Sequence, residues 1–347
     1  MRRLTSALVA LLRLRAFHFN LLLFLVLQPL SAAADAERLN VFARLKSVEG
    51  RMVSGQTALA IDTSAQAIGF GNTTKTVADF TIKPEVGFHP NINGGNPEGA
   101  LVVGGLSFAG DPDLYRKQGM IYGLSAYQST RAFYGHGRYL DASITGGHSH
   151  SFEHGIGITN TSFNACSINH MSNWWFVDVC TEKSISITQL NRSEASSQKL
   201  VLSHFYEGET GSFSQFQIGA KRVPGDGYSQ NQLLLGIETV HPSGSYSTWD
   251  TALGELVANE LVTRLAVSGS VSTQIREKPI QFAASYESLE GGMLLGYPRN
   301  DKRFSISASA PLWNNINATL GYTYSDSTID YYDSATPTFG LSFETPL

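Results

Sequence analysis

The stretch Lys302-Arg-Phe-Ser-Ile-Ser-Ala-Ser-Ala310 alternates apolar and small polar residues with a period of two. Successive side chains of a β-strand point to opposite faces of a sheet, so Phe304 and Ile306 share one face and the serines share the other. The same alternation recurs at 265–272, 280–287, 318–325 and 338–344. Turn-forming Asn, Asp, Gly and Pro residues separate these segments, as a meander of antiparallel strands requires.

The residue types on the two faces indicate the environment of the strands. Charged residues make up 16% of the chain, against roughly a quarter in an ordinary soluble domain. The second face of each strand is mostly Ser, Thr, Gly and Gln, whereas a soluble sandwich exposes many Lys and Glu side chains. Apolar residues toward lipid and small polar residues toward a lumen are typical of a transmembrane barrel, which must close because a bilayer excludes open sheet edges. We therefore predict an all-β, transmembrane, antiparallel up-and-down β-barrel; a soluble secreted β protein is the alternative.

The chain length limits the number of strands. A predicted signal of 34 residues leaves 313 of the 347 residues, and each membrane strand with its connection takes ~20–25 residues. The sequence therefore predicts about 14 strands, within a range of 12 to 16. We expect a lead-in at 35–64 and a barrel at 65–347, without a second domain.

The first strand and some connections of the predicted barrel lack the clear alternation of the later segments. The first strand is predicted at 65–71, and strand 338–344 is expected to pair with it to close the barrel. Residues 250–263 fit either a helix after an Asp cap or the start of a strand. Residues 288–303 are predicted to form a longer polar connection.

The N-terminus resembles a cleaved secretory signal. Four arginines and no acidic residue precede the seven-residue apolar core Leu21–Leu27, and small residues follow it, with cleavage expected after Ala33 or Ala34. Removing residues 1–34 takes four arginines from the 25 basic residues and none of the 29 acidic ones, which leaves a net charge of −8. This charge argues against nucleic-acid binding. The expected location is the outer membrane of a Gram-negative bacterium, with outer-membrane lipid and the barrel-assembly machinery as partners.

The chain has two cysteines, Cys166 and Cys180. An exported protein with two cysteines most simply pairs them, and closing a loop of about 15 residues is worth roughly 3 kcal/mol in the chain-entropy model. We predict a structural disulfide; two free thiols are the alternative.

The region from Asp301 to Phe343 resembles the C-terminal barrel of the surface lipoprotein assembly modifiers, without that family's helical repeat domain. The matching residues are Asp301 and Arg303 at the start of a strand, Asp326, Ser327, Ile329, Tyr332 and Asp333 in a loop, and Gly340 and Leu341 in the last strand. The resemblance implies a 14-stranded outer-membrane barrel that assists translocation or surface display of a lipoprotein client.

Three functional classes follow from the sequence: the export role that the resemblance implies, a pore for small polar solutes that mildly favours cations, and a membrane-embedded hydrolase. The hydrolase rests on the cluster His148, His150, Glu153 and His154, which is also a weak candidate for a metal site. The simpler interpretation of this cluster is a polar turn. We therefore expect no catalytic residue, no cofactor and no enzymatic activity.

Pro346 and Thr345 shorten the usable final strand, and the segment predicted as the first strand is short and contains glycine. These features predict weak pairing where the first and last strands meet.

Overall fold

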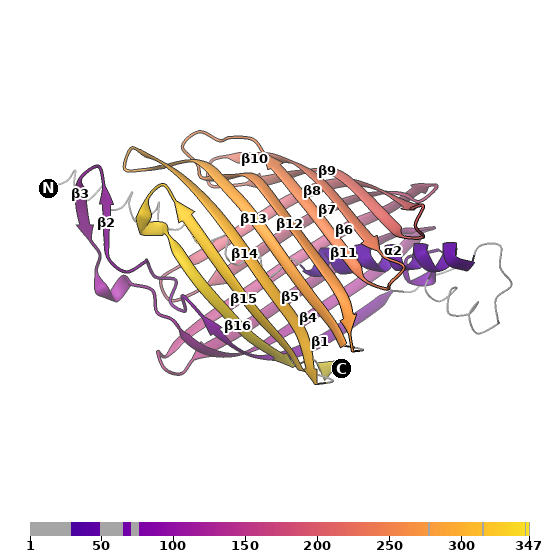
Figure 1. The fold of residues 1–347 in the computed structure, drawn as a ribbon, viewed down its shortest axis with the longest axis horizontal. Helices are drawn as coiled ribbons and strands as arrows, with labels where there is room; N and C mark the ends of the chain where they lie inside the picture. The colour runs from indigo at the N-terminus through magenta and orange to yellow at the C-terminus, as the bar shows by residue number, and fades with distance from the viewer. Residues whose placement is uncertain are drawn as a thin grey trace.

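The computed structural model describes residues 29–48, 65–70, 76–276, 278–313, 316–343 and 345–346. Fourteen antiparallel strands form a closed barrel in which each strand pairs with its neighbours in chain order (Figure 1). They are β1 (Val77–His89), β4 (Gly119–Gly135), β5 (Arg138–Ser151), β6 (Ile156–Ser172), β7 (Trp175–Ile187), β8 (Arg192–Glu207), β9 (Phe213–Pro224), β10 (Ser229–Val240), β11 (Tyr246–Gly254), β12 (Val262–Ile275), β13 (Lys278–Leu294), β14 (Tyr297–Trp313), β15 (Ile316–Ser327) and β16 (Ser334–Phe343). The predicted fold class and central strand number are confirmed.

The two ends of the barrel differ. At one end, called the turn end here, short connections such as 136–137 and 173–174 join β4 to β5 and β6 to β7. At the other, called the loop end, the long segment 90–118 joins β1 to β4 and carries a separate hairpin of β2 (Ala100–Val103) and β3 (Leu106–Ala109). Figure 1 shows this hairpin at one extreme of the molecule.

The outer wall of the barrel is apolar. Each strand from β4 to β16 exposes large hydrophobic side chains on its outward face. One example from each strand, in order, is Leu124, Ile144, Phe163, Val179, Leu200, Ile218, Leu233, Trp249, Val271, Phe282, Ile306, Leu320 and Phe339. Water would leave this wall poorly solvated, whereas lipid tails match it, as on the outside of a transmembrane barrel. The outer wall thus accounts for the apolar face of the sequence pattern.

Among the described residues, no helix is both long and apolar enough to cross a bilayer.

The opposite face of the strands lines the lumen and is polar. One row runs from Thr248 on β11 through Ser270 on β12, Ala283, Ser307 and Gly321 to Thr338 on β16. The next row contains Ser285, Ser305, Thr323 and Thr336. Small side chains in successive strands keep this part of the wall thin, which leaves the lumen wide there.

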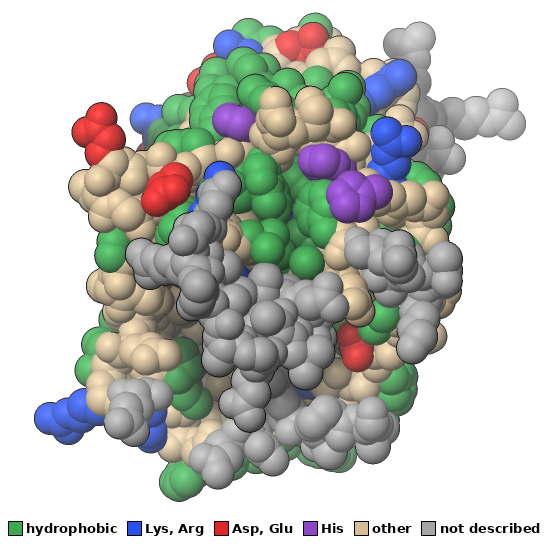
Figure 2. All heavy atoms as spheres, turned by 90° about the vertical axis from the view of Figure 1, so that its right-hand side faces the viewer, with side chains coloured by type: hydrophobic (Ala, Val, Ile, Leu, Met, Phe, Trp, Pro, Cys, Tyr) green, Lys and Arg blue, Asp and Glu red, His purple; other side chains and the backbone are tan. Residues whose placement is uncertain are grey.

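A helix lies inside the turn end of the barrel. Helix α2 (Pro29–Val48) packs against β8, β9 and β10 and extends outward through the turn end (Figure 1). Its buried residues Leu39, Val41 and Phe42 join a hydrophobic cluster with lumen-facing residues of the wall. Figure 2, which looks onto this end, shows hydrophobic side chains gathered within the ring of strands, with histidines beside them. The helix crosses the predicted cleavage site at Ala33 or Ala34; residues 1–28 of the predicted signal lie outside the described residues.

The prediction of a first strand at 65–71 is wrong. Residues 65–67 form one helical turn, and Phe70 donates its backbone N–H to the Ala65 carbonyl. Ile68 is fully buried in the same cluster as α2, so burial in the lumen overrides the β-forming pattern of this segment. The barrel begins at β1, which continues through Pro84.

The structure decides between the two alternatives left open for residues 250–263. They are not helical: β11 ends at Gly254 and β12 begins at Val262, with a loop between them. The prediction of a polar connection at 288–303 is wrong. The predicted polar connection 288–303 consists mainly of the strands β13 and β14, which meet at a turn formed by Leu295 and Gly296. Leu295 has a φ of 52° and Gly296 a φ of 85°, so both residues adopt the left-handed conformation that a two-residue hairpin turn needs.

The seam that closes the barrel, between β1 and β16, is paired in two short pieces. Glu85–Phe88 pairs with Phe339–Ser342, and β17 (Thr345–Pro346) pairs with Thr81 and Ile82. By contrast, every residue of β1 from Val77 to His89 is paired with β4. The last strand therefore does close the barrel as predicted, but its partner is β1.

Prolines explain the interruption of the seam. Pro84 of β1 lies between the two paired pieces, and Pro337 of β16 lies just before the first. Proline has no backbone N–H, so a sheet tolerates it where no ladder hydrogen bond is needed. The β1–β4 and β15–β16 pairings continue through these residues, which places both missing donors on the seam side. Neither reason that the sequence offered for weak pairing at the seam holds, because residues 65–70 are not a strand and because Thr345 and Pro346 pair with Ile82 and Thr81. The gap between the two described pieces lies at Pro84 instead.

Candidate functional site: the lumen and its helix

Helix α2 presents one face to the lumen wall. Arg38, Leu39, Phe42 and Leu45 recur at the three- and four-residue spacing that places side chains on one side of a helix. Arg44 and Ser47, on another side, are exposed. The helix is therefore positioned by its own amphipathic pattern, although that pattern contains a buried arginine.

Arg38 forms a buried ion pair with Asp178 of β7. Its two terminal nitrogens donate to the two carboxylate oxygens at 3.0 and 2.7 Å, and Arg38 is 1% exposed. The guanidinium carbon lies 5.1 Å from the ring centre of Phe176 and 5.9 Å from that of Phe205. A planar guanidinium that is held by two hydrogen bonds and packs beside two aromatic rings has little freedom, so this contact fixes the depth of α2 in the lumen.

A second ionic contact lies beside the first. Arg131 of β4 donates to Glu37 of α2 at 2.7 Å and to Asp141 of β5 at 2.6 and 3.2 Å. The guanidinium of Arg131 lies 4.7 Å from the ring centre of Tyr139, which is fully buried. Glu37 and Arg38, which are adjacent in the helix, thus pair with Arg131 and Asp178 of the wall, respectively.

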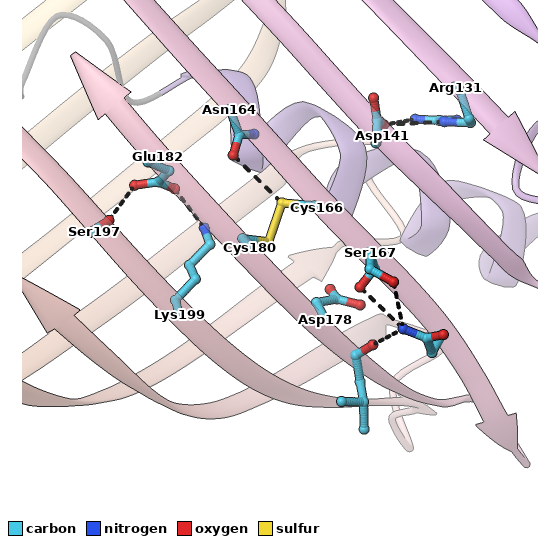
Figure 3. Close-up of a disulfide and its surroundings, with 12 residues drawn as sticks. Arg131, Asp141, Asn164, Cys166, Ser167, Asp178, Cys180, Glu182, Ser197 and Lys199 are labelled. Carbon is cyan, nitrogen blue, oxygen red and sulfur yellow. Dashed lines mark hydrogen bonds and ion pairs between the residues drawn. A yellow bond between two sulfur atoms is a disulfide. The ribbon is translucent and has the colours of Figure 1, made fainter. Parts of the chain in front are cut away.

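The predicted disulfide is confirmed and lies in this part of the wall. Cys166 of β6 and Cys180 of β7 are directly paired across the two strands, with a Cα–Cα distance of 4.1 Å. One row of the sheet runs from Arg131 through Asp141 and Cys166 to Cys180. Figure 3 shows the disulfide between the Arg131–Asp141 pair and Asp178. The disulfide therefore links β6 to β7, the strand that carries Asp178.

Aromatic side chains complete the contact at the rim of the turn end. The ring centre of Phe42 lies 4.8 Å from that of Trp174, 5.8 Å from that of Phe205 and 6.0 Å from that of Phe213. Trp174 belongs to the turn between β6 and β7 and packs on α2.

The segment 65–70 closes the turn end further. Phe70 packs edge-on against His170 and Trp174, with ring centres 4.9 and 5.3 Å apart. The Gly137 N–H donates to the Gly69 carbonyl at 2.8 Å, and Arg131 donates to the Ala67 carbonyl at 2.8 Å. Together α2 and residues 65–70 occupy the turn end of the lumen.

Charged side chains also face the lumen farther from the turn end. Lys199 of β8 pairs with Glu182 of β7 at 3.1 Å, and Arg303 of β14 pairs with Glu287 of β13 at 3.3 Å. Lys221 of β9 is within electrostatic reach of both glutamates. These residues form a cluster of charges on the lumen wall at β7 to β9 and at β13 and β14.

The residues that carry the family resemblance lie mostly at the loop end. Asp301 accepts from Arg299 at 2.9 and 2.6 Å and from the Ser327 hydroxyl at 2.6 Å. Asp333 accepts the Ser327 N–H at 2.7 Å, and the guanidinium of Arg299 lies 3.5 Å from the ring centre of Tyr332. This network folds the loop that contains the short 3₁₀ helix η3 (Asp330–Tyr332) onto the rim of the barrel.

The same loop holds the β2–β3 hairpin over the loop end. Ile329 packs with Val103 and Leu294, and the Tyr331 hydroxyl donates to the Pro97 carbonyl at 3.0 Å. The rest of the resemblance has other surroundings: Asp326 lies opposite Lys302 on the outer face, while Gly340 and Leu341 pair with β1 at the seam. These residues thus have structural roles in the loop and the seam.

The histidine cluster is only partly brought together: the rings of His148 and His150 both lie beside Gly157, whereas Glu153 and His154 lie beside Gly119. His148 contacts the Thr159 hydroxyl on the outer face, the His150 ring packs against Phe152, and His154 contacts the Gln118 carbonyl. Within the described part of the chain, no group of three or more His, Cys, Asp or Glu side chains is arranged to hold a metal ion.

Sequence reasoning missed the α2 site because its residues come from the lead-in and from strands distant in the chain. Two signals were available: Glu37 and Arg38 lie at the start of an amphipathic pattern, and Asp178 is a charge within an otherwise apolar stretch, Trp174–Cys180. Neither identifies the other as its partner.

No family model matches the chain, and no curated protein matches it. Among solved structures, the chain is similar to Pseudomonas putida OprB, with a TM-score of 0.46 and 8% identity over 84% of this chain and 96% of that one. It is also similar to Acinetobacter baumannii OccAB2, with a TM-score of 0.42 and 8% identity over 81% of this chain and 99% of that one. At this identity a structural likeness concerns the fold alone.

Proposed function

We propose that the protein is a pore for small polar solutes in the outer membrane of a Gram-negative bacterium, closed at its turn end by α2. The observation that carries the proposal is the lumen: a wall of small polar side chains and paired charges, obstructed at one end by a helix of the same chain. An eight-stranded barrel fills its interior with side chains, and 16 to 18 strands leave an aqueous channel; 14 strands lie near the second case. The proposal includes no catalytic residue.

The orientation follows from the lengths of the connections. In bacterial outer-membrane barrels the short turns face the periplasm and the longer loops face outward. The turn end, with α2, is therefore assigned to the periplasm, and the 90–118 segment to the cell surface. A solute from outside would meet the β2–β3 hairpin first, then the cluster of charges on the lumen wall, and last α2.

Ion selectivity tests whether current passes through this lumen. Purified protein in planar bilayers is expected to give discrete channel openings that mildly favour potassium over chloride, because acidic residues outnumber basic ones. The Lys221→Ala substitution removes a positive charge beside Glu182 and Glu287. It is expected to shift the reversal potential in a KCl gradient toward stronger cation preference.

The matched control for this test is Lys302→Ala, which removes an exposed lysine from the outer face of β14. Its reversal potential should equal that of the unmodified protein. Absence of channels in all three proteins, or an equal shift in both variants, would contradict a pore through this lumen.

The second candidate is the role implied by the resemblance, assistance in the translocation or display of a lipoprotein client. The interrupted seam supports it, since an edge with unused backbone groups can accept a strand from another chain. Cysteines at Val86 and Leu341, which face each other across the seam, would lock it on oxidation. If the seam opens for a client, the locked protein loses surface display and regains it on reduction; display at the normal rate in the locked protein would rule out seam opening.

A further inference from the structure

The part of the lumen wall that holds α2 has the composition of a ligand site. We call it the wall site and define it by Arg131, Tyr139, Asp141, Phe176, Asp178 and Phe205, all of which come from the barrel strands β4, β5, β7 and β8. It contains one carboxylate flanked by two aromatic rings and, beside it, one guanidinium held in place by a second carboxylate. The site therefore presents a place for a cation next to a place for an anion.

Two side chains of α2 occupy these places. The Arg38 guanidinium lies on Asp178 and beside the Phe176 and Phe205 rings, while the Glu37 carboxylate lies on Arg131. Charge-assisted, two-pronged contacts with cation–π stacking are how proteins recognise guanidinium and ammonium ligands. The adjacent acidic and basic groups of α2 thus behave like a bound zwitterion.

The wall site does not depend on α2 for its own construction. Asp141 orients Arg131 from the neighbouring strand, the Cys166–Cys180 disulfide holds β6 and β7 together, and the strand register places Asp178 in the same row as Tyr139. Residues of α2 contribute no strand pairing to the barrel. The occupant can therefore be exchanged while the wall keeps its shape.

One buried polar group of the wall site remains unused. Tyr139 is fully buried, its ring lies against the Arg131 guanidinium, and its hydroxyl has no hydrogen-bond partner among the described residues. It is also within electrostatic reach of both ion pairs, so it lies between the two charged places. A buried hydroxyl normally has a partner, and a ligand with polar groups at both ends can supply one.

We propose that the wall site binds a small zwitterionic solute with a carboxylate and a guanidinium or ammonium group, of the class of the basic amino acids, and that α2 occupies the site as an internal competitor. The carboxylate would bind Arg131, and the cationic group would bind Asp178 beside the Phe176 and Phe205 rings. This inference builds on the proposed pore, because such a solute would displace α2 and open the turn end. A tethered competitor has a high effective concentration, so the solute must be abundant to replace it.

The test measures binding of L-arginine to the full-length protein by isothermal titration calorimetry. The substitutions Glu37→Gln and Arg38→Gln remove the two charged side chains of α2 that occupy the wall site. This vacated variant is expected to bind L-arginine about tenfold or more tightly than the unmodified protein does. Agmatine has the guanidinium but no carboxylate, and it should bind this variant about tenfold more weakly than L-arginine does.

Two further substitutions in the vacated variant locate the binding. Adding Asp178→Asn should abolish measurable L-arginine binding, whereas Asp250→Asn, at a lumen-facing acid of β11 outside the wall site, should leave it unchanged. Heat-dependent migration on gels identifies folded preparations of each protein. Equal binding of agmatine and L-arginine, no saturable binding, or binding that survives Asp178→Asn would overturn the proposal.

The unmodified protein provides a second measurement. L-arginine on the turn-end side of a planar bilayer should raise the fraction of time that the channel is open, and agmatine should do so less. Channels with the expected Lys221-dependent selectivity but without any arginine effect or binding would remove this inference and leave the pore. Specific arginine binding by a protein that forms no channels would support the wall site and contradict the proposed pore.

Discussion

The Phe42→Ala variant is expected to be open far more often than the unmodified protein in planar bilayers. Phe42 is 2% exposed and packs on Trp174, Phe205 and Phe213 at the rim of the turn end. Truncating a buried Phe costs about 3–5 kcal/mol. Each 1.4 kcal/mol changes an equilibrium about tenfold. If the loss falls on docking of α2, the ratio of open to closed channels rises by about a hundredfold or more.

The barrel itself should tolerate this change. Phe42 contacts the wall from the helix and takes no part in strand pairing, so heat-dependent migration on gels should be retained. Phe282→Ala is a matched control, because Phe282 is 49% exposed on the outer face of β13. A folded Phe42→Ala protein with the open fraction of the unmodified one would show that α2 is not what closes the lumen.

Replacing Asp301 with Ala is expected to release the loop between β15 and β16 and, with it, the β2–β3 hairpin. Arg299 and Asp301 are 4% and 7% exposed, and Asp301 also accepts from the Ser327 hydroxyl. Removing one partner of a buried ion pair leaves an uncompensated charge and costs about 3–5 kcal/mol. The loss is local, because the affected groups lie at the loop end and the ladders of β14 and β15 do not depend on the Asp301 side chain.

Limited proteolysis of intact cells or proteoliposomes measures this effect. Cleavage within 328–333 and in the 90–118 segment should become faster in Asp301→Ala, while the barrel remains protected. Asp326→Ala is the control, since Asp326 is exposed on the outer face and has no part in the network. Equal cleavage of the Asp301→Ala and unmodified proteins would show that the network does not hold the two loops together.

The sequence by itself determined the barrel. The alternation of apolar residues with Ser, Thr and Gly is a local property of each segment. In a bilayer the backbone N–H and C=O groups of such strands can all be hydrogen-bonded only if the sheet closes into a barrel. Chain length divided by the span of one strand then sets the number near 14. The disulfide was also predictable, since two cysteines in an exported chain have one possible intramolecular pairing, and the structure places Cys166 and Cys180 as direct neighbours.

The tertiary structure decided which segments fill the lumen. Residues 65–70 have the composition of a strand, but Ile68 and Phe70 gain more by packing into the cluster with α2 than by pairing with β16. In the same way, nothing in the sequence near Arg38 indicates that its partner is Asp178, 140 residues away. Strand formation depends on neighbouring residues in the chain and on the bilayer. The packing inside the lumen depends on which side chains of distant strands face each other. Only the closed barrel brings these side chains together.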